Sequence, residues 1–277
     1  MIITVVGLGV VGGSFVKALK GQGHEVYGVD IDEETLARAK ADGCIKGGFV
    51  DGREIIKRSD MTIICLYPSL VLDYIKEHEF KKGSIITDAV GVKTHFLNEA
   101  MNLLKDKDVE FVSGHPMAGR ENKGYLYASK EVFQGANYIL IQHEQNSKSA
   151  IAMMEQFVSN LGFHSVKIMS PQAHDEIISF TSQLPHVIAV SLIDSDNQKY
   201  DTGKYIGDSY RDLTRIANIN EDLWTELFFT NKVNLLKSIQ GFEDQLDILK
   251  KAIKEEDSQT LKAMFIESSK RRRNLEK

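Results

Sequence analysis

The sequence predicts an α/β protein in which a doubly wound, mostly parallel sheet domain precedes an all-helical C-terminal domain. From residue 1 to residue 169, short β-branched runs alternate with amphipathic stretches, which is typical of a parallel sheet covered by helices on both faces. After residue 169 the strand signal stops and long helical patterns follow. The length of 277 residues also fits about two domains of roughly 150 residues. We therefore expect domains at 1–169 and 170–277.

The first domain is predicted to contain seven strands and the helices between them. The expected strands are Ile2–Val6, Glu25–Val29, 61–65, 84–87, 110–113, 138–142 and Ser165–Met169. Helices are expected at 12–20 and at 33–42, the second ending at Gly43, as helices commonly do at glycine.

The second domain is predicted to be a set of packed helices. They are expected at 170–195, about 204–216, 221–254 with a break near Gly241, and Ser258–Asn274. Ser170 is a suitable N-cap, and Pro171 occupies the first helical position, where proline is favoured. No linker rich in proline, glycine or serine separates the halves, so we expect them to pack closely around a cleft.

Composition excludes several classes of protein. With 42% hydrophobic and 26% charged residues, the chain is globular, and its net charge of −5 gives no field that attracts nucleic acid or anionic lipid. The 2 cysteines, Cys44 and Cys65, suggest neither a disulfide framework nor a metal site, which fits a reducing cytoplasm. No apolar stretch reaches the roughly 18 to 20 residues of a membrane-spanning helix. We expect no membrane partner and no signal peptide.

A glycine-rich motif follows the first strand and opens the first helix. The pattern G-x-G-x-x-G is made by Gly7, Leu8, Gly9, Val10, Val11 and Gly12. In such a turn the first glycine permits the tight bend, the second lets the backbone approach a pyrophosphate, and the third lets helix and strand pack closely. The helix N-terminus then offers N–H groups to the phosphates. This context predicts a Rossmann-type dinucleotide site.

Asp30 ends the second strand, 18 residues after Gly12. A carboxylate there can accept hydrogen bonds from both hydroxyls of an adenosine ribose, whereas a 2′-phosphate would meet like-charge repulsion. The next residues, Ile31, Asp32 and Glu33, supply no arginine to reverse that preference. Asp30 therefore predicts NAD as the cofactor. The alternative, a cap for the following helix, suits Asp32 better.

Two histidines and two arginines are candidates for the chemistry. His115 follows a predicted strand, at the edge of the sheet where ligands bind, and an imidazole is suited to accept a proton at neutral pH. His186 follows Pro185, which kinks a helix and can aim the imidazole into a cleft. Arg211 and Arg215 lie four residues apart on one helical face and can grip a carboxylate. Each of these residues also has a purely structural interpretation.

Taken in order, the motifs resemble those of the prephenate/arogenate dehydrogenases of tyrosine biosynthesis. The matching strings are GLGVVG at Gly7, Asp30, DAVGVK at Asp88, GHPMAGRE at Gly114, SQLPH at Ser182, and RDLTRIA at Arg211 with Trp224 nine residues after Arg215. The glycine turn is common to many dehydrogenases, but the histidine loop, LPH and RDxTRIA together are far more specific. The resemblance covers nearly the whole chain.

The resemblance implies an NAD-dependent oxidative decarboxylation of prephenate to 4-hydroxyphenylpyruvate, with hydride transfer from the ring and loss of the ring carboxylate. It implies that His115 is the catalytic base for the ring hydroxyl and that His186 and Arg215 contact the substrate. Glu121 corresponds to an acid near the mouth of the site, where it can pair with Arg211 or modulate binding. Arg211 itself is better placed to pair with Glu121 or Asp212.

One position departs from the family pattern. Members usually carry Asp-x-Gly-Ser-x-Lys after the fourth strand, with a serine that touches the catalytic histidine and the nicotinamide. Here Gly91 stands where that serine would be. Water, Ser113 or Thr94 must then replace the hydroxyl, or the histidine is oriented differently.

The family reading also predicts how the protein is organised. We expect a monofunctional enzyme with neither a fused chorismate mutase nor a regulatory domain, so any tyrosine feedback would act at or near the active site. The helical half is expected to form a homodimer, because it is more apolar than a lone bundle can bury. The residues concerned are Leu235, Leu236, Ile239, Phe242, Leu246, Ile248 and Leu249.

Three alternatives remain open on sequence alone. The substrate could be arogenate, which carries an ammonium where prephenate carries a keto group. A β-hydroxyacid dehydrogenase shares the domain order but needs a catalytic lysine and asparagine in the helical half, and no matching string is present. A non-catalytic NAD sensor is the third alternative, to which Gly91 lends some support.

Overall fold

A computed structural model describes residues 1–119 and 122–275 of the chain. By internal contacts these residues form two compact units, Met1–Asn231 and Lys232–Lys277, which are described separately below. The candidate active-site residues of the sequence analysis all fall within the range of the first unit.

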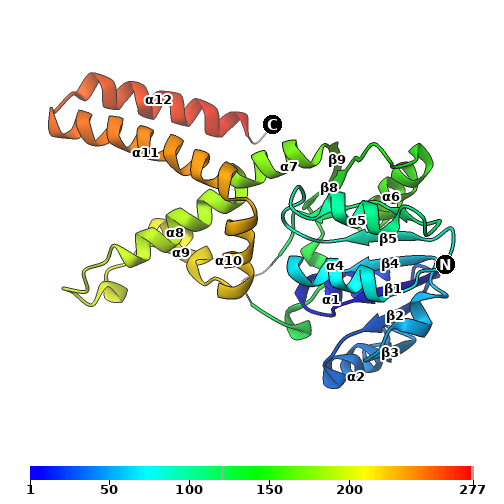
Figure 1. Ribbon diagram of the computed structural model, residues 1–277. Coiled ribbons are helices and arrows are strands. Elements are labelled where there is room, and N and C mark those ends of the chain that lie inside the picture. The colour runs from blue at the N-terminus through cyan, green and yellow to red at the C-terminus, as the bar shows by residue number, and fades with distance from the viewer. Residues whose placement is uncertain (120–121, 276–277) are drawn as a thin grey trace. The chain divides into compact units, whose positions relative to one another are not determined.

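The first unit contains a six-stranded parallel sheet in the order β3-β2-β1-β4-β5-β6 (Figure 1). The strands are β1 (Ile2–Val6), β2 (Glu25–Val29), β3 (Gly47–Phe49), β4 (Met61–Ile64), β5 (Ile85–Asp88) and β6 (Glu110–Phe111). This is the order of dinucleotide-binding folds, and its direction reverses between β1 and β4, where ligands bind beyond the carboxyl ends of the strands. The doubly wound prediction is confirmed.

Helices cover both faces of this sheet because successive strand residues point to opposite sides. Ile3 and Val5 of β1 join one core with α1 (Val10–Leu19), while Val6 joins a second core on the other face. The remaining covering helices are α2 (Glu33–Ala41), α3 (Arg53–Ile56), α4 (Pro68–Glu77), α5 (Leu97–Leu104) and α6 (Lys148–Asn160). The expected helix boundaries at 12–20 and 33–42 agree with α1 and α2 to within two residues.

A second, three-stranded sheet was not expected from the sequence. It has the order β7-β8-β9 and consists of β7 (Gly114–Pro116), β8 (Asn137–Ile141) and β9 (Ser165–Met169). β7 runs antiparallel to β8, and His115 pairs with Ile139. The chain leaves the first sheet after β6 and enters the second at Gly114, where a Cβ atom would lie 2.2 Å from the Tyr138 hydroxyl. Only glycine fits this crossing.

The helical part of the first unit begins with one long helix, Pro171–Asp194. It comprises α7 (Pro171–Ile178), a π-helical turn (Ser179–Gln183) and α8 (Leu184–Asp194). The wide turn lies just before Pro185, which cannot donate a helical hydrogen bond and crowds the preceding turn. The distortion expected at Pro185 is therefore a π-turn within a continuous helix. α9 (Asp208–Thr214), a short turn (Arg215–Ala217) and α10 (Glu221–Thr230) follow.

By length and composition alone, Pro171–Asp194 could cross a membrane, with a mean hydropathy of 1.3 in its most apolar window. This differs from the expectation that no apolar stretch is long enough to span a membrane. The helix carries the buried Asp175 and His174, however, and both make hydrogen bonds inside the first unit. These contacts bind one face of the helix to the first unit, and 28% of its most apolar window is buried.

The second unit is a helical hairpin of α11 (Lys232–Lys254) and α12 (Ser258–Asn274), which lie side by side in Figure 1. Asp257 caps α12 by accepting hydrogen bonds from the N–H groups of Gln259 and Thr260. The break expected near Gly241 is wrong: α11 runs through that residue, and the interruption falls at Asn231. The Asn231 side chain donates to the Asp175 carbonyl and to Gln183 Oε1, contacts that the local sequence pattern does not reveal.

Candidate active site

The glycine-rich turn has the geometry of a phosphate-binding loop. Gly7 has a φ of +82°, in the left-handed region, and its N–H donates to the Val29 carbonyl at 2.8 Å. A Cβ atom at Gly12 would lie 1.9 Å from the Gly7 oxygen, so a side chain there cannot fit. Around Gly9 nothing lies within 4 Å of such an atom, and no side chain caps α1. The helix N-terminus is thus open to an anion.

Asp30 lies just beyond β2 and braces this turn. Its Oδ2 accepts the Leu8 N–H at 2.6 Å, and its Oδ1 accepts the Asp32 N–H at 2.9 Å. Each carboxylate oxygen keeps a further lone pair with which it can accept a ribose hydroxyl. As expected, Asp32 rather than Asp30 caps the next helix, by accepting the Glu34 N–H.

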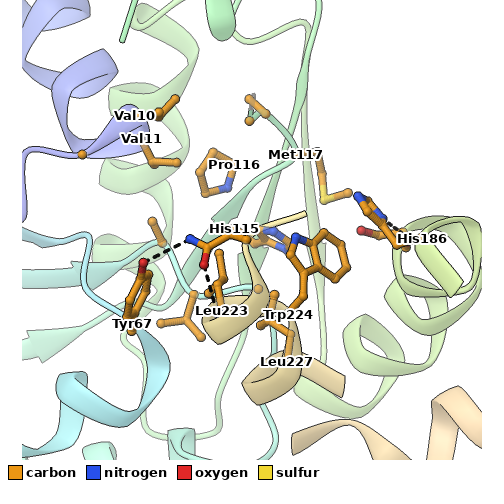
Figure 2. A pocket seen from close by; sticks show the side chains of 18 of the residues that line it. Val10, Val11, Tyr67, His115, Pro116, Met117, His186, Leu223, Trp224 and Leu227 are labelled. Carbon is orange, nitrogen blue, oxygen red and sulfur yellow. Dashed lines mark hydrogen bonds between the residues drawn. The ribbon is translucent and has the colours of Figure 1, made fainter. Parts of the chain in front are cut away.

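A cavity of about 620 Å³ extends from the glycine turn to the helices that follow β9. Figure 2 shows Val10, Val11, His115, Trp224 and His186 arranged around it. Among the described residues, no aspartate or glutamate lines this cavity, whereas Lys123 and Arg215 do. The cavity is therefore suited to an anionic ligand.

The cavity brings together most of the residues that the sequence singled out. Those in its lining are Gly9, Val10, Val11, Gly12, Gly91, His115, His186 and Arg215. Gly7 and Leu8 shape the turn behind it, and Asp30 is linked to it through the Leu8 N–H. Glu121 lies outside the described residues.

His115 is joined to two buried residues that the sequence analysis did not select. His115 Nδ1 lies 2.9 Å from His174 Nε2, and His174 Nδ1 lies 2.7 Å from Asp175 Oδ1. Asp175 also accepts the backbone N–H groups of Lys93 and Thr94, each at 2.8 Å. The chain of contacts therefore links β7, α7 and the loop that follows β5.

Burial controls the charges of His115, His174 and Asp175. It lowers the pKa of His115 well below its ordinary value of 6.5, and the neighbouring His174 and Lys93 lower that pKa further. Burial also lowers the pKa of His174, although the hydrogen bond to Asp175 opposes the shift. Burial alone would raise the pKa of Asp175, but hydrogen bonds from His174 and Thr94 outweigh it and lower this pKa. At neutral pH both imidazoles are neutral and the carboxylate is charged.

Lys93 fixes the strand that carries His115. Its ammonium is fully buried and donates to Asp88 Oδ2 and to the Gly114 carbonyl, each at 2.6 Å. Burial lowers the pKa of Lys93, and the ion pair with Asp88 opposes that shift. The family string DAVGVK thus supplies both partners of a buried ion pair behind the site.

Gly91 faces the other ring nitrogen of His115. A Cβ atom at Gly91 would lie 3.8 Å from His115 Nε2 and 3.3 Å from Leu227 Cδ2. A serine in this position would reach the histidine, as the family pattern implies. Ser113, one of the suggested replacements, is buried with its hydroxyl unpaired among the described residues, and Thr94 is bound to Asp175 through its backbone.

His186 is held by its own helix and by an aromatic ring. Its Nδ1 lies 2.8 Å from the Ser182 carbonyl, so this nitrogen carries the proton and Nε2 remains for a ligand. The imidazole lies against Trp224, with ring centroids 3.6 Å apart. Burial lowers the pKa of His186, and the hydrogen bond to Ser182 opposes that shift.

The two arginines have different surroundings. Arg215 lines the cavity, whereas Arg211 does not, and Arg211 Nη1 lies 3.3 Å from Asp208 Oδ1. Asp208 is thus a partner of Arg211 that the sequence did not suggest, while Glu121, one of the two expected partners, lies outside the described residues. This geometry does not support the expected contact between Arg211 and the substrate.

The His174–Asp175 pair carries one signal that sequence reasoning could have used. Two polar, titratable residues stand one turn into a helix, in the stretch PQAHDEII, at positions that the helical period assigns to the buried face. Buried charged groups need partners, so such a pair points to a polar network. No cluster of three or more metal-binding side chains occurs in the described parts of the chain.

Comparison with known proteins agrees with this architecture. Residues 15–167 match the family described as "Prephenate dehydrogenase, nucleotide-binding domain", and residues 170–267 match "Prephenate dehydrogenase, dimerization domain". These ranges differ from the compact units of the structure, and the domain boundary at residue 169 stays a prediction.

Individual relatives are similar over almost the entire chain. A prephenate dehydrogenase of Lactococcus lactis is 29% identical over 99% of this chain and 77% of its own length. The A. aeolicus prephenate dehydrogenase, solved with hydroxyphenyl propionate and NAD+, superposes with a TM-score of 0.88 at 28% identity, covering 99% of this chain and 98% of that one. A Synechocystis arogenate dehydrogenase structure gives 0.84 at 25% identity, over 99% and 100% of the chains. With both family ranges matched in order, the chain belongs to the prephenate dehydrogenase family.

Proposed function

We propose that the protein oxidises and decarboxylates prephenate with NAD, releasing 4-hydroxyphenylpyruvate, CO2 and NADH. The observation that carries the proposal is the single cavity lined by the glycine turn, His115, His186 and Arg215. A dinucleotide turn, a neutral imidazole and an arginine are the groups that this reaction needs. The names of the relatives from Lactococcus lactis and A. aeolicus support the same activity.

The residues present fit NAD. The turn from Gly7 to Gly12 cannot accept a side chain at Gly12, and it leaves open space above Gly9 for a pyrophosphate. Asp30 retains the acceptor capacity for a ribose hydroxyl. When bound, NAD supplies the hydride acceptor for the reaction. Gly91 lines the cavity beside His115 and contributes no side chain to it.

The chain's own residues handle the proton and the substrate charges. His115 Nε2 accepts the ring hydroxyl proton while that carbon loses hydride, and returns it to the oxygen once the ring carboxylate leaves as CO2. The electron pair of the broken C–C bond completes the aromatic ring. Arg215 holds a substrate carboxylate through its guanidinium fork, and His186 contacts the substrate through Nε2.

Arogenate is the second candidate substrate, because the Synechocystis neighbour is an arogenate dehydrogenase. Arogenate carries an ammonium group, which a carboxylate would recognise. The relatives from Lactococcus lactis and A. aeolicus are both named prephenate dehydrogenases, and this favours the keto acid prephenate. The two substrates use the same base and the same cofactor site.

The deciding experiment mixes purified protein with NAD and either prephenate or arogenate and follows NADH absorbance. Turnover of prephenate with a kcat/KM at least tenfold above that of arogenate supports the proposal. The reverse preference assigns the protein to arogenate. Absence of turnover with both substrates contradicts the activity altogether.

The assembly and its regulation are part of the proposal. The match to a dimerization domain supports a homodimer, and the exposed apolar side chains of α11 and α12 supply the surface.

Tyrosine, which shares the phenolic ring of the product, would compete for the same cavity. The two free thiols, Cys44 and Cys65, fit a cytoplasmic location.

A further inference from the structure

His115 has two ring nitrogens, and catalysis requires a lone pair on the one that faces the cavity. Its Nδ1 points to His174, while its Nε2 lies on the side of Gly91. A neutral imidazole exists as two tautomers, and only one of them leaves Nε2 free to accept a proton. What selects this tautomer determines whether the base works.

The selection begins at Asp175. This carboxylate accepts the N–H groups of Lys93 and Thr94 and faces His174 Nδ1 at 2.7 Å. An ionised carboxylate can only accept hydrogen bonds, so His174 Nδ1 must carry the proton. His174 is completely buried, and burial lowers its pKa, so the ring is neutral. Its Nε2 then carries a lone pair and no proton.

The same reasoning passes to the next ring. Because His174 Nε2 is an acceptor, the nitrogen 2.9 Å away, His115 Nδ1, must donate a proton to it. His115 is then left with its lone pair on Nε2. The two hydrogen bonds therefore have one consistent direction, from His115 through His174 to Asp175.

We propose that Asp175 and His174 are positioning residues that hold His115 in the tautomer with a free Nε2. This inference rests on the proposed function, in which that nitrogen accepts the substrate proton.

Gly91 makes this arrangement more important. A side chain at residue 91 would contact His115 Nε2, but glycine supplies none, so among the described residues the hydrogen bond that orients the ring is the one from Nδ1 to His174. The charged and titratable groups around the pair are His174, Asp175, Lys93 and Asp88. Lys93 and His174 both disfavour a cationic His115, whereas Asp175 favours a cationic His174.

The test removes the acceptor without removing the ring. His174→Phe keeps an aromatic ring in place of the buried imidazole but offers nothing to His115 Nδ1, so both tautomers of His115 become accessible. We expect kcat to fall by about 10²-fold or more, with KM for prephenate and Kd for NAD within threefold. His174→Gln restores a hydrogen-bond acceptor, and its kcat should be at least about tenfold higher than that of His174→Phe.

A matched control is available in His78. It is also buried, bonds only a backbone carbonyl through Nδ1 and stacks on Tyr74 outside the cavity lining. His78→Phe should leave kcat within about twofold of wild type. Loss of activity in this control as well would mean that any buried imidazole is needed for folding, which overturns a specific role for His174.

A spectroscopic measurement tests the tautomer without relying on activity. In wild-type protein labelled with ¹⁵N-histidine, the His115 signals, assigned with His115→Asn, should show a protonated Nδ1 and an unprotonated Nε2. The His174→Phe variant should show a mixture of the two tautomers. A wild-type proton on Nε2, or a kcat of His174→Phe within threefold of wild type, overturns the proposal.

These measurements separate the two hypotheses. If wild-type protein turns over neither prephenate nor arogenate, the proposed function fails, while the ¹⁵N signals still decide the tautomer. If His174→Phe does not fold, the Gln variant and the wild-type spectrum give the answer. In wild type, kcat/KM should fall on acidification with a single ionisation. In His174→Gln this fall should occur at a different pH.

Discussion

Asp30 shows how one carboxylate can serve both the fold and the ligand. It accepts two backbone N–H groups, those of Leu8 and Asp32, that tie the glycine turn to the start of α2. This arrangement places a fixed negative charge where an adenosine ribose would lie. A 2′-phosphate at that position would be repelled.

The first prediction is therefore a cofactor preference. We expect kcat/KM with NAD to exceed that with NADP by more than about tenfold, since a clash of about 1.4 kcal/mol already gives this factor. Steady-state kinetics with both cofactors measure it. Asp32→Asn, which keeps the helix cap, is the control and should leave the ratio unchanged. Equal rates with the two cofactors would refute the role of Asp30.

A second prediction concerns His115 as the base. His115→Asn should keep NAD affinity but lower kcat by about 10² to 10⁴, the usual contribution of a positioned acid–base group. Stopped-flow or steady-state NADH formation measures the loss. Near-normal turnover would place the proton acceptor elsewhere.

The pH profile of the wild-type enzyme is the companion measurement. The active form of His115 is unprotonated, and burial lowers its pKa well below 6.5. As the pH rises through that lowered pKa the base becomes available, so kcat/KM should be flat at neutral pH and fall only on acidification. An inflection above pH 6.5 from this group would contradict the burial argument.

The third prediction distinguishes the two arginines. Arg215→Ala should weaken substrate binding by about 2 to 3 kcal/mol through KM, with little change in NAD binding, as for a lost charged hydrogen bond. Arg211→Ala is the matched control, because Arg211 lies outside the cavity lining and pairs with Asp208. If Arg211→Ala raises KM while Arg215→Ala leaves it within about threefold, the two roles are reversed.

At the scale of elements, the site depends on a buried ion pair that joins two sheets. Lys93 follows β5 of the first sheet and donates to the carbonyl of Gly114 in β7 of the second. Its partner Asp88 ends β5. Both side chains are fully buried, so neither charge can be satisfied by water if the other is removed.

The fourth prediction follows from that burial. Lys93→Met should destabilise the protein by about 3 to 5 kcal/mol in denaturant unfolding, because Asp88 is left as an unpaired buried charge. The surface ion pair of Lys81 with Asp60 is the control, and Lys81→Met should cost less than about 1 kcal/mol. Equal, small losses in both variants would mean that water reaches Asp88.

At the scale of the whole molecule, the helical hairpin of α11 and α12 carries apolar side chains on its surface. Leu235 and Ala252 are buried, whereas Leu236, Ile253, Phe265 and Ile266 are each more than half exposed. Exposed apolar surface of this extent marks an interaction site. The family match to a dimerization domain agrees with this interpretation.

The fifth prediction is a dimer in solution. Light scattering at micromolar concentration should give about twice the chain mass of 31.1 kDa. Replacing Phe265 and Ile266 together by lysine should shift the mass toward the monomer. Ile31, which is exposed on the first unit, provides the control, since Ile31→Lys should leave the mass unchanged. A wild-type mass of about 31 kDa would contradict the proposal.

Much of the fold and half of the site follow from short-range sequence patterns. The strands Ile2–Val6 and Glu25–Val29 and the helix Ser258–Asn274 have the predicted bounds, because β-branched runs and caps act within a few residues. The glycine turn, too, has a local cause: the close approach of Gly12 to the Gly7 carbonyl excludes any other residue. His115, His186 and Arg215 could be selected because motifs carry them.

What only the tertiary structure decided depends on contacts between distant parts of the chain. The two sheets separate at Gly114, where the backbone lies against the side chain of Tyr138. The helix is interrupted at Asn231, whose side chain donates hydrogen bonds to the Asp175 carbonyl and to Gln183 Oε1. His174 lies 59 residues from His115 in the sequence and 2.9 Å from it in space. No local period encodes such a pair, because burial and hydrogen-bond direction exist only once the chain has folded. The sequence by itself therefore determined the fold class and predicted the cofactor turn and the candidate base His115, and the tertiary structure decided which residues contact that histidine.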